Sequence, residues 1–359
     1  MNAPFAIDTR PVEAAFVREA YLCGPEEAAR IERFVREAGG TVFHRPTWLM
    51  AIERGTGQAA TGLVIERGGN IAGWLPLTCV HSPVFGRALV SSGFAVDGGI
   101  LAPRTGDAAW LAEAAQELAQ RRACAEVELR GGPVPAGWHA QEDSHVGFVR
   151  PLAEDDEAEL LAIPRKHRAE VRKGLKNDLE VSVGSHEADR AAHHAVYAQS
   201  VHNLGTPVFP RSLFDAVLDA FDEDADILTV RHQGEAVASV LSLYHDGAVL
   251  PFWGGGLRAA RNLRANELMY FRLMGHARAR GCNRFDFGRS KTGSGPAHYK
   301  KNWGFEAEPL IYARWHAPGS APRDVDPTSD TLASRIALWK KLPHGVANRL
   351  GPWIARGLG

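Results

Sequence analysis

Residues Ile227–Gly256 read ILTVRHQGEAVASVLSLYHDGAVLPFWGGG and carry the clearest local signals of the fold. Three β-prone runs meet at Gln233-Gly234 and at Asp246-Gly247, and a short glycine turn between such runs is the strongest local signal of a hairpin. The stretch therefore predicts an antiparallel meander of three strands that ends in three glycines. Apolar residues then recur at helical spacing over Asn266–Arg280, which predicts a helix and, after it, a strand parallel to the last strand of the meander.

The first half of the chain carries the same order of elements. Gly62–Glu66 and Ile71–Val80 flank the turn sequence RGGN at residues 67–70, which predicts another pair of antiparallel strands. A glycine pair follows at Gly98-Gly99, and Asp107–Arg122 again has apolar residues at helical spacing. Each half therefore predicts a meander, a glycine cluster, a long helix and a further strand.

Two pairs of segments also match each other in sequence. Thr41–Leu49 reads TVFHRPTWL and Thr206–Phe214 reads TPVFPRSLF, each with a Val-Phe pair followed by Pro and Arg. Arg122–Arg130 matches Arg280–Gly288 at a similar offset of about 160 residues, so we interpret the chain as a duplication. The predicted fold class is α+β, with two tandem domains that each contain a mixed, mostly antiparallel sheet flanked by helices.

Composition and charge exclude several classes of protein. The chain has 359 residues with 41 Lys and Arg against 42 Asp and Glu, and this net charge of −1 excludes nucleic-acid binding through bulk charge. No apolar run reaches the roughly 18 residues that a membrane span needs, and residues 1–10 lack the pattern of a signal peptide. The four cysteines, at positions 23, 79, 124 and 282, show no metal-binding spacing. We therefore expect a cytoplasmic protein with reduced thiols, no disulfide and no structural zinc.

Several catalytic motifs are missing from the sequence. The serines in Arg289–Gly295 lack the GxSxG spacing of a nucleophile elbow, and the glycines 254–256 belong to neither a Walker loop nor a GxGxxG motif. The sequence therefore disfavours a covalent intermediate, nucleotide hydrolysis and nicotinamide chemistry.

The order of elements is that of the acyl-CoA N-acyltransferase fold, called GNAT-like. Five segments further resemble the FemAB-like aminoacyl and acyl transferases, in particular the FemAB-related proteins of exosortase (PEP-CTERM) and exopolysaccharide systems. These segments are Phe43–Trp48, Lys166–Lys173, Leu204–Pro207, Phe285–Ser290 and Tyr299–Phe305. The most specific element of the resemblance is the strand sequence DFGRS followed closely by YKKNWGF.

The resemblance implies two tandem GNAT-like domains and an acceptor site in a cleft that involves both. We place the domains at residues 1–150 and 151–316, followed by a linker and a basic tail at residues 317–359. The implied activity is N-acyl or aminoacyl transfer to an amine or hydroxyl group of a cell-envelope precursor, such as one of peptidoglycan or exopolysaccharide. The alternative is a non-catalytic protein that binds or scaffolds a glycan precursor.

The acyl donor stays open at this point. A GNAT domain binds the donor pyrophosphate at a Q/R-x-x-G-x-G/A loop, whereas residues 261–266 read RNLRAN and lack its glycine. This departure argues against ordinary acetyl-CoA use and favours the non-catalytic alternative, while the intact Tyr299-Lys300 pair favours an enzyme. We expect acyl-CoA or aminoacyl-tRNA as the donor, no bound cofactor, no DNA partner, and tRNA only as an aminoacyl donor.

Three residues carry the catalytic hypothesis. The resemblance matches Lys300 to the family's lysine that follows an aromatic residue, where it would stabilise charge that develops on the donor carbonyl. Tyr299 would pack beside the donor or fill the core. Asp286 would orient Lys300 or an acceptor group, or tie the strand end to the neighbouring backbone. We expect Lys300 and Lys301 to lie in a strand and to face opposite sides of it.

A basic run predicts a helix with one cationic face. Arg165, Arg168, Arg172 and Lys176 lie at i, i+3, i+7 and i+11 behind Pro164, a residue suited to a helix start. Such a face fits the phosphates of a nucleotide-sugar, a lipid-linked glycan precursor or RNA, and the neutral overall charge favours a small anionic ligand. A solvated linker helix is the alternative interpretation. We take Arg168 and Arg172 as candidates for substrate binding.

Further candidates come from the resemblance and from the glycine-rich strand end. His193 and His194 have no acidic or Cys partner at ligand spacing, so we assign no metal site there. The loop at residues 202–207 either lines the acceptor site or is an ordinary helix end at Gly205. The further substrate-binding candidates are Trp48, Tyr197, His202, Asn203, Trp253, Asn266, Arg289 and Ser290.

The C-terminal residues form a separate basic element. Ser334–Leu358 contains five Lys or Arg residues and no acid, with large apolar residues between them. This composition predicts an amphipathic segment, which we expect to be broken at Pro343 and Pro352. The segment either contacts the inner face of a membrane or a partner protein, or packs back across the two domains.

Overall fold

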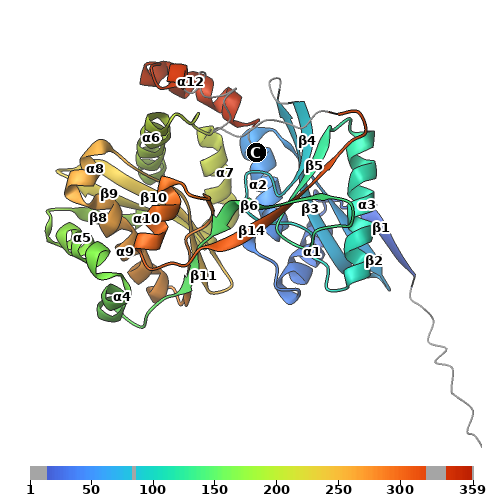
Figure 1. Ribbon diagram of the computed structural model, residues 1–359, viewed down its shortest axis with the longest axis horizontal. Helices are drawn as coiled ribbons and strands as arrows, with labels where there is room; N and C mark the ends of the chain where they lie inside the picture. Colours follow the sequence, from blue (N-terminus) through green and yellow to red (C-terminus); the bar gives the residue numbers. More distant parts are fainter. Residues whose placement is uncertain (1–13, 83–85, 321–336, 358–359) are drawn as a thin grey trace, which may run out of the picture.

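The computed structural model describes residues 14–82, 86–320 and 337–357. In these ranges it contains two mixed sheets flanked by helices, which confirms the predicted α+β fold class (Figure 1). Each sheet is built on an antiparallel meander, and the strand after the following helix pairs parallel with the last strand of that meander, as expected.

The first sheet has the strand order β1-β2-β3-β4-β5-β14-β6-β13. Its strands are β1 (Ala15–Glu19), β2 (Ala59–Arg67), β3 (Asn70–Ser82), β4 (Gly86–Ser91), β5 (Glu126–Arg130), β6 (His139–Gly147), β13 (Ser290–Lys291) and β14 (Glu308–His316). The meander is β2 to β4, and β5 is the strand that returns parallel to β4.

The second sheet has the strand order β7-β12-β11-β10-β9-β8. Its strands are β7 (Val149–Pro151), β8 (Glu180–Gly184), β9 (Ala225–His232), β10 (Glu235–His245), β11 (Ala248–Gly256) and β12 (Arg284–Asp286). The three strands expected within residues 227–256 are therefore β9, β10 and β11. β12 returns parallel to β11, with Ala248 opposite Arg284.

Two strands of the second half lie in the first sheet. β14 pairs antiparallel with both β5 and β6, and β13 pairs with β6. The chain therefore passes from the first sheet to the second after Gly147, and returns to the first after Asp286. Sheet membership does not follow a division at residue 150, because long-range strand pairing ties the two halves together.

Helices cover both sheets (Figure 1). They are α1 (Pro25–Glu37), α2 (Pro46–Thr56), α3 (Thr105–Arg121), α4 (Asp156–Ala162), α5 (Arg165–Lys176), α6 (Glu187–Leu204), α7 (Arg211–Phe221), α8 (Arg258–Leu263), α9 (Ala265–Ala279), α10 (Gly295–Asn302) and α12 (His344–Ala355). α3 and α9 match the two expected long helices, and α6 ends at Gly205 in the left-handed conformation. No described helix is both long enough and apolar enough to cross a bilayer.

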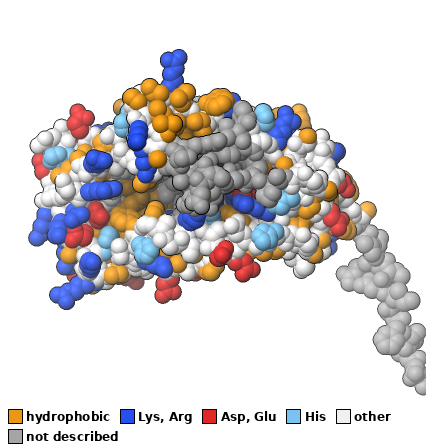
Figure 2. Space-filling model, turned by 45° about the horizontal axis from the view of Figure 1, so that its top comes forward, with side chains coloured by type: hydrophobic (Ala, Val, Ile, Leu, Met, Phe, Trp, Pro, Cys, Tyr) orange, Lys and Arg blue, Asp and Glu red, His pale blue; other side chains and the backbone are white. Residues whose placement is uncertain are grey.

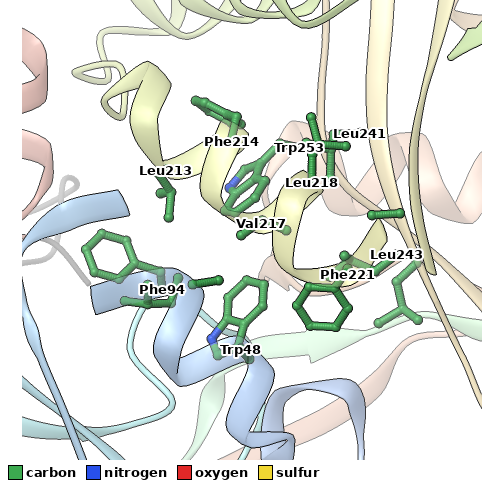
Figure 3. Packing of buried hydrophobic residues seen from close by; sticks show 14 of the residues in the cluster. Trp48, Phe94, Leu213, Phe214, Val217, Leu218, Phe221, Leu241, Leu243 and Trp253 are labelled. Carbon is green, nitrogen blue, oxygen red and sulfur yellow. The ribbon is translucent and has the colours of Figure 1, made fainter. Parts of the chain in front are cut away.

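The matching helices α2 and α7 pack against each other between the two sheets (Figures 1 and 3). Their backbones come so close that a Cβ on Gly55 would lie 2.5 Å from the Cα of Leu213. Large side chains from both halves surround this contact, among them Trp48, Phe94, Phe214, Phe221 and Trp253. The two halves of the duplication are thus joined by one shared hydrophobic core.

Candidate active site

The chain passes between the two sheets at two adjacent points, at Phe148 and at Phe287, and we call these two points together the crossing. Phe148 lies between β6 and β7, Phe287 follows β12, and the amide of Phe287 donates to the carbonyl oxygen of Phe148 over 2.8 Å. Helix α10 follows Phe287 in the chain. Ser294 caps this helix by accepting a hydrogen bond from the amide of Ala297. The last turn of α10 carries Lys300, whose side chain reaches back to the crossing.

The crossing holds the ammonium group of Lys300. Nζ donates to the backbone carbonyl oxygens of Gly288 at 3.1 Å and of Arg289 at 2.8 Å. It also lies 5.4 Å and 5.5 Å from the ring centroids of Phe148 and Phe287. An ammonium has three donors, so one N–H has no hydrogen-bond partner within the described chain and can meet an oxygen of a bound molecule.

Burial sets the protonation of the groups at the crossing. It lowers the pKa of Lys300 to about 8, although the nearby Asp286 carboxylate opposes this shift. Burial also raises the pKa of Asp286, whose Oδ1 accepts a hydrogen bond from the Gly288 amide at 2.9 Å. Asp286 therefore ties the strand end to the turn, and its negative charge favours the protonated form of Lys300.

The side chain of Arg289 connects the crossing to the first sheet. Its Nη1 donates to the hydroxyl of Tyr312 on β14 at 2.7 Å, and that hydroxyl donates to the carbonyl oxygen of Val96 at 2.9 Å. His145 on β6 stacks on the ring of Tyr312 at 5.4 Å between centroids. Burial and the charge of Arg289 lower the pKa of His145 to about 4. We call His145, Asp286, Arg289, Lys300 and Tyr312 the junction site.

Buried charges on β5 and β14 support the junction site. The Glu128 carboxylate pairs with Arg130 at 2.8 Å and with Arg314 at 2.7 Å. Arg130 also donates to the carbonyl oxygen of Ala95 at 2.8 Å, which fixes the loop that carries the Tyr312 acceptor. Burial by itself would raise the pKa of Glu128, but the two guanidinium groups outweigh it and lower the pKa to about 2.

Tyr299 packs in an aromatic cluster that includes Phe287 of the crossing. The expectation of a strand at this position is wrong, because Tyr299, Lys300 and Lys301 lie on helix α10, where neighbours are about 100° apart. Tyr299 packs against the rings of His167 and Trp303, and burial raises its pKa. Lys301 is exposed, so the two lysines differ in surroundings even though they do not face opposite sides of a strand.

The glycines at the end of β11 let two candidate residues approach its backbone. A Cβ on Gly255 would lie 3.4 Å from the Cα of Tyr197, and one on Gly256 would lie 2.3 Å from Oδ1 of Asn266. Burial raises the pKa of Tyr197, which packs on the ring of Phe214. Tyr197 from α6 and Asn266 from the first turn of α9 therefore reach the strand end from opposite faces of the sheet.

The turn before α9 has a left-handed backbone conformation at Arg264, although this residue is not a glycine. Arg264 has a φ of 55°, in the left-handed region that glycine favours. Its Nε pairs with Glu170 on α5 at 2.6 Å. A Cβ on Gly174 would lie 2.8 Å from the carbonyl oxygen of Arg264, and Asn177 donates to the carbonyl oxygen of Leu263 at 2.7 Å. Helix α5 and the residue after it therefore cover this turn.

α5 confirms the predicted basic helix. Its outer face lines a pocket of about 420 Å³ formed by Arg165, Arg168, Ala169, Arg172, Lys173 and Lys176. The guanidinium of Arg168 donates to the carbonyl oxygens of Leu161 at 2.8 Å and Ile163 at 3.0 Å, at the end of α4. Arg172 and Lys176 are exposed and have no partner among the residues that the structure describes. The cations free to bind a ligand are therefore those of Arg165, Arg172 and Lys176 rather than Arg168.

The remaining candidates lie in other places. Trp48 is fully buried and stacks on Trp253 at 6.0 Å between centroids, inside the core shared by the two halves. His202 is buried under α12, and the neighbouring Asn203 is exposed. Ser290 is buried on β13, directly after the junction residue Arg289. The described part of the chain has no group of three His, Cys, Asp or Glu side chains that could hold a metal ion.

Sequence patterns alone do not reveal the contribution of β5 and β14. Residues 126–130 read EVELR, with alternating charged and apolar residues. This alternation indicates a buried ion network only once the strand is known to be buried on both sides. Tyr312 and Arg314 carry no such signal, because only the pairing of β14 with β5 brings them to the site.

Comparison with known proteins supports the fold. Residues 165–301 match the model of a family described as an acetyltransferase (GNAT) domain. No curated protein sequence matches the chain. The tandem arrangement of two GNAT-fold domains is seen in solved structures that are similar to this chain.

Three such structures span most of the chain. FemX is similar with a TM-score of 0.64 and 15% identity, over 80% of this chain and 95% of that one. A tandem GNAT protein from the clavulanic acid biosynthesis pathway has a TM-score of 0.57 and 12% identity, over 86% and 100%. The C-terminal domain of a putative lysylphosphatidylglycerol synthetase from Agrobacterium fabrum has a TM-score of 0.55 and 14% identity, over 81% and 92%.

Proposed function

We propose that the protein is a FemAB-like acyltransferase that transfers an acyl or aminoacyl group to an amine or hydroxyl of an anionic cell-envelope or exopolysaccharide precursor. The observation that carries this proposal is the ammonium of Lys300, which two backbone carbonyls hold at the crossing between the sheets. A cation fixed in this way can donate its remaining N–H to the oxyanion that forms when the acceptor attacks the donor carbonyl.

The junction site also contains groups that can serve the proton steps of acyl transfer. The attacking amine or hydroxyl loses a proton, and the leaving group, the thiol of an acyl-CoA or a ribose hydroxyl of a tRNA, gains one. The lowered pKa of His145 keeps its imidazole neutral near pH 7, so one ring nitrogen can accept a hydrogen bond from the attacking group, although the imidazole is a weak base. Asp286 is the second acceptor beside Lys300.

The resemblance and the fold neighbours support the class of acceptor. The segment that contains Lys300 is the part of the chain that most resembles the FemAB-like proteins. One neighbour in fold is the C-terminal domain of a putative lysylphosphatidylglycerol synthetase, a name that describes the joining of a lysyl group to phosphatidylglycerol, an anionic lipid acceptor. The cation of Arg289 suits an acceptor that carries phosphate groups, whereas the free N–H of Lys300 is assigned to the oxyanion.

The covered turn before α9 bears on the donor. Because α5 packs on Leu263 and Arg264, we propose that the donor phosphates do not bind at the N-terminus of α9 as in ordinary acetyl-CoA enzymes. The pocket on α5, with Arg172 and Lys176, is an alternative place for an anionic donor or acceptor. The same covered turn favours the second candidate function, a non-catalytic protein that binds a glycan precursor.

One experiment separates the two functions. Mass spectrometry of small molecules that co-purify with the protein identifies the acceptor, and turnover is then measured with acyl-CoA and with aminoacyl-tRNA donors. Lys300→Met should lower kcat by about 10²- to 10³-fold, the effect of losing one positioned oxyanion donor. The exposed neighbour provides the matched control, since Lys301→Met should leave kcat nearly unchanged. Equal modest losses in both variants, or binding of the acceptor without turnover, would reject the enzymatic proposal.

A further inference from the structure

Helix α12 buries its small side chains and exposes most of its large ones. Its buried residues are Ala347, Gly351 and Ala355. Three of its large apolar residues are exposed, by 44% at Val346, 46% at Leu350 and 50% at Trp353, while Ile354 is half-buried. A helix that packs only for stability does the reverse, because burial of large apolar side chains is what stabilises it. The outward side of α12 is therefore shaped for something other than this chain's own core.

The protein holds α12 in this orientation at both ends. The ring of His344 lies 4.2 Å from that of His202 on α6, in the second half. The carbonyl oxygen of Arg356 accepts a hydrogen bond from Nε2 of Gln58, in the first half, at 2.8 Å. The expected break at Pro352 is wrong, because the helix runs through this residue. α12 thus packs across both halves, and the side chains of Val346, Leu350 and Trp353 stay outside.

Cations surround the exposed apolar side. Lys340 and Lys341 precede the helix and are exposed, as are Arg349 and Arg356 on the helix itself. Residues 337–357 contain no Asp or Glu. Figure 2 shows hydrophobic side chains gathered along one edge of the molecule with Lys and Arg beside them. An exposed apolar patch of this kind on a folded protein marks an interaction surface.

From this combination we infer that α12 and the turn before it form a docking surface for an anionic lipid bilayer. Leu350 and Trp353 enter the boundary between headgroups and acyl chains, and the flanking cations contact lipid phosphates. The indole of Trp353 is suited to this boundary because one part is apolar and its N–H is polar. None of the junction-site residues lies on α12, so the inference is independent of the acyl-transfer proposal.

A second copy of the chain fits this surface less well than a bilayer does. In a twofold dimer the same patch meets itself, so Arg349, Arg356 and the two lysines of one copy would face the same cations of the other. Juxtaposed like charges disfavour such a contact, whereas an anionic bilayer neutralises them. Charge complementarity therefore selects the bilayer.

Co-sedimentation of the full chain with lipid vesicles tests the inference. Vesicles of phosphatidylcholine with phosphatidylglycerol should bind the protein, vesicles of phosphatidylcholine alone should not, and salt should weaken the binding. Trp353→Ser should lower the affinity about tenfold. Lys341→Gln combined with Arg349→Gln should lower it about fivefold for each cation removed.

Matched variants on other surfaces provide the controls. Trp110→Ser on α3 removes an indole that is 45% exposed, and Arg33→Gln with Arg36→Gln removes two exposed cations on α1. Both controls should keep the affinity of the parent protein, and thermal unfolding should show that every variant is folded. Unchanged binding by Trp353→Ser, or equal losses in the controls, would overturn the inference. Sedimentation velocity tests for a dimer. If the parent protein forms a dimer that Trp353→Ser abolishes, and does not bind vesicles, the surface is an interface with a second copy instead.

Discussion

The carbonyl oxygen of Arg289 accepts a hydrogen bond from Nζ of Lys300 over 2.8 Å, at the point where the chain passes from the second sheet to the first. The side chain of the same arginine donates to Tyr312 on β14. One residue therefore links the Lys300 ammonium to a strand of the opposite sheet. The position of Lys300 depends on how both sheets pair, and not on α10 alone.

The rate of the proposed transfer should fall as pH rises through about 8. Burial lowers the pKa of Lys300 to about 8, so its cationic form is lost in this range. Lys300→Arg keeps a positive charge at every pH in the range, and its residual activity should lose this alkaline decline. The measurement is kcat between about pH 6 and pH 10. A rate that instead rises through pH 8 in the parent would mean that the neutral amine acts as a base.

Loss of Glu128 should destabilise the protein strongly. Glu128→Gln leaves the buried Arg130 and the half-buried Arg314 without their carboxylate, and breaking the buried pair with Arg130 costs about 3 to 5 kcal/mol. Urea denaturation at neutral pH measures the difference in the free energy of unfolding. Glu306→Gln, at an exposed position, should cost no more than about 0.5 kcal/mol and is the control.

The loss in the free energy of unfolding caused by Glu128→Gln should also depend on pH. The folded pKa of Glu128, about 2, lies below the unfolded value near 4.3, so the ionised form stabilises the folded state. This contribution is fully present above about pH 5 and is lost as pH falls from about 4 toward 2. The difference in unfolding free energy between parent and variant should therefore shrink over that range. A difference that stays constant would contradict the assigned pKa shift.

Glycine should be tolerated better than alanine at position 264. Arg264→Gly and Arg264→Ala both lose the ion pair with Glu170, but only glycine adopts a φ of 55° without strain. The glycine variant should be more stable by about 1 kcal/mol, which a pair of thermal or urea unfolding curves can resolve. Equal or reversed stabilities would show that the turn before α9 is not left-handed in solution.

The pocket on α5 should bind a small anion through Arg172 and Lys176. Arg172→Gln with Lys176→Gln should weaken the binding of inorganic pyrophosphate, with each lost charged contact costing about 1.5 to 3 kcal/mol. Isothermal titration calorimetry measures the affinity. Lys166→Gln with Lys301→Gln removes two exposed cations outside the pocket and is the charge-matched control. If both double variants lose the same affinity, the pocket has no specific role.

Arg168 should behave differently from its neighbours on the same helix. Its guanidinium donates to the carbonyl oxygens of Leu161 and Ile163, so it stabilises the end of α4. Arg168→Gln should lower the melting temperature, whereas Arg172→Gln should leave it unchanged. Differential scanning calorimetry of the two single variants compares them directly, and the opposite order would restore Arg168 as a ligand-binding cation.

The candidate site could be predicted only in part from the sequence. The resemblance selected Asp286, Arg289 and Lys300, and the structure brings these three together at the crossing. His145 and Tyr312 could not be found in this way, because only the pairing of strands β6 and β14 brings them to the site. Trp48 and Trp253 were expected to bind substrate, but they lie in the core that joins α2 and α7.

Local sequence patterns are enough to predict the meander β9 to β11, the helices α5 and α9, and the duplication. Glycine turns and apolar periodicity act between residues a few positions apart, so they can be recognised without a fold. Three features follow instead from tertiary contacts: β14 pairs between β5 and β6, Arg264 takes a left-handed conformation, and α12 turns Trp353 outward. Each of these depends on contacts between segments distant in sequence, whose free energy exceeds the local preference of the residues involved.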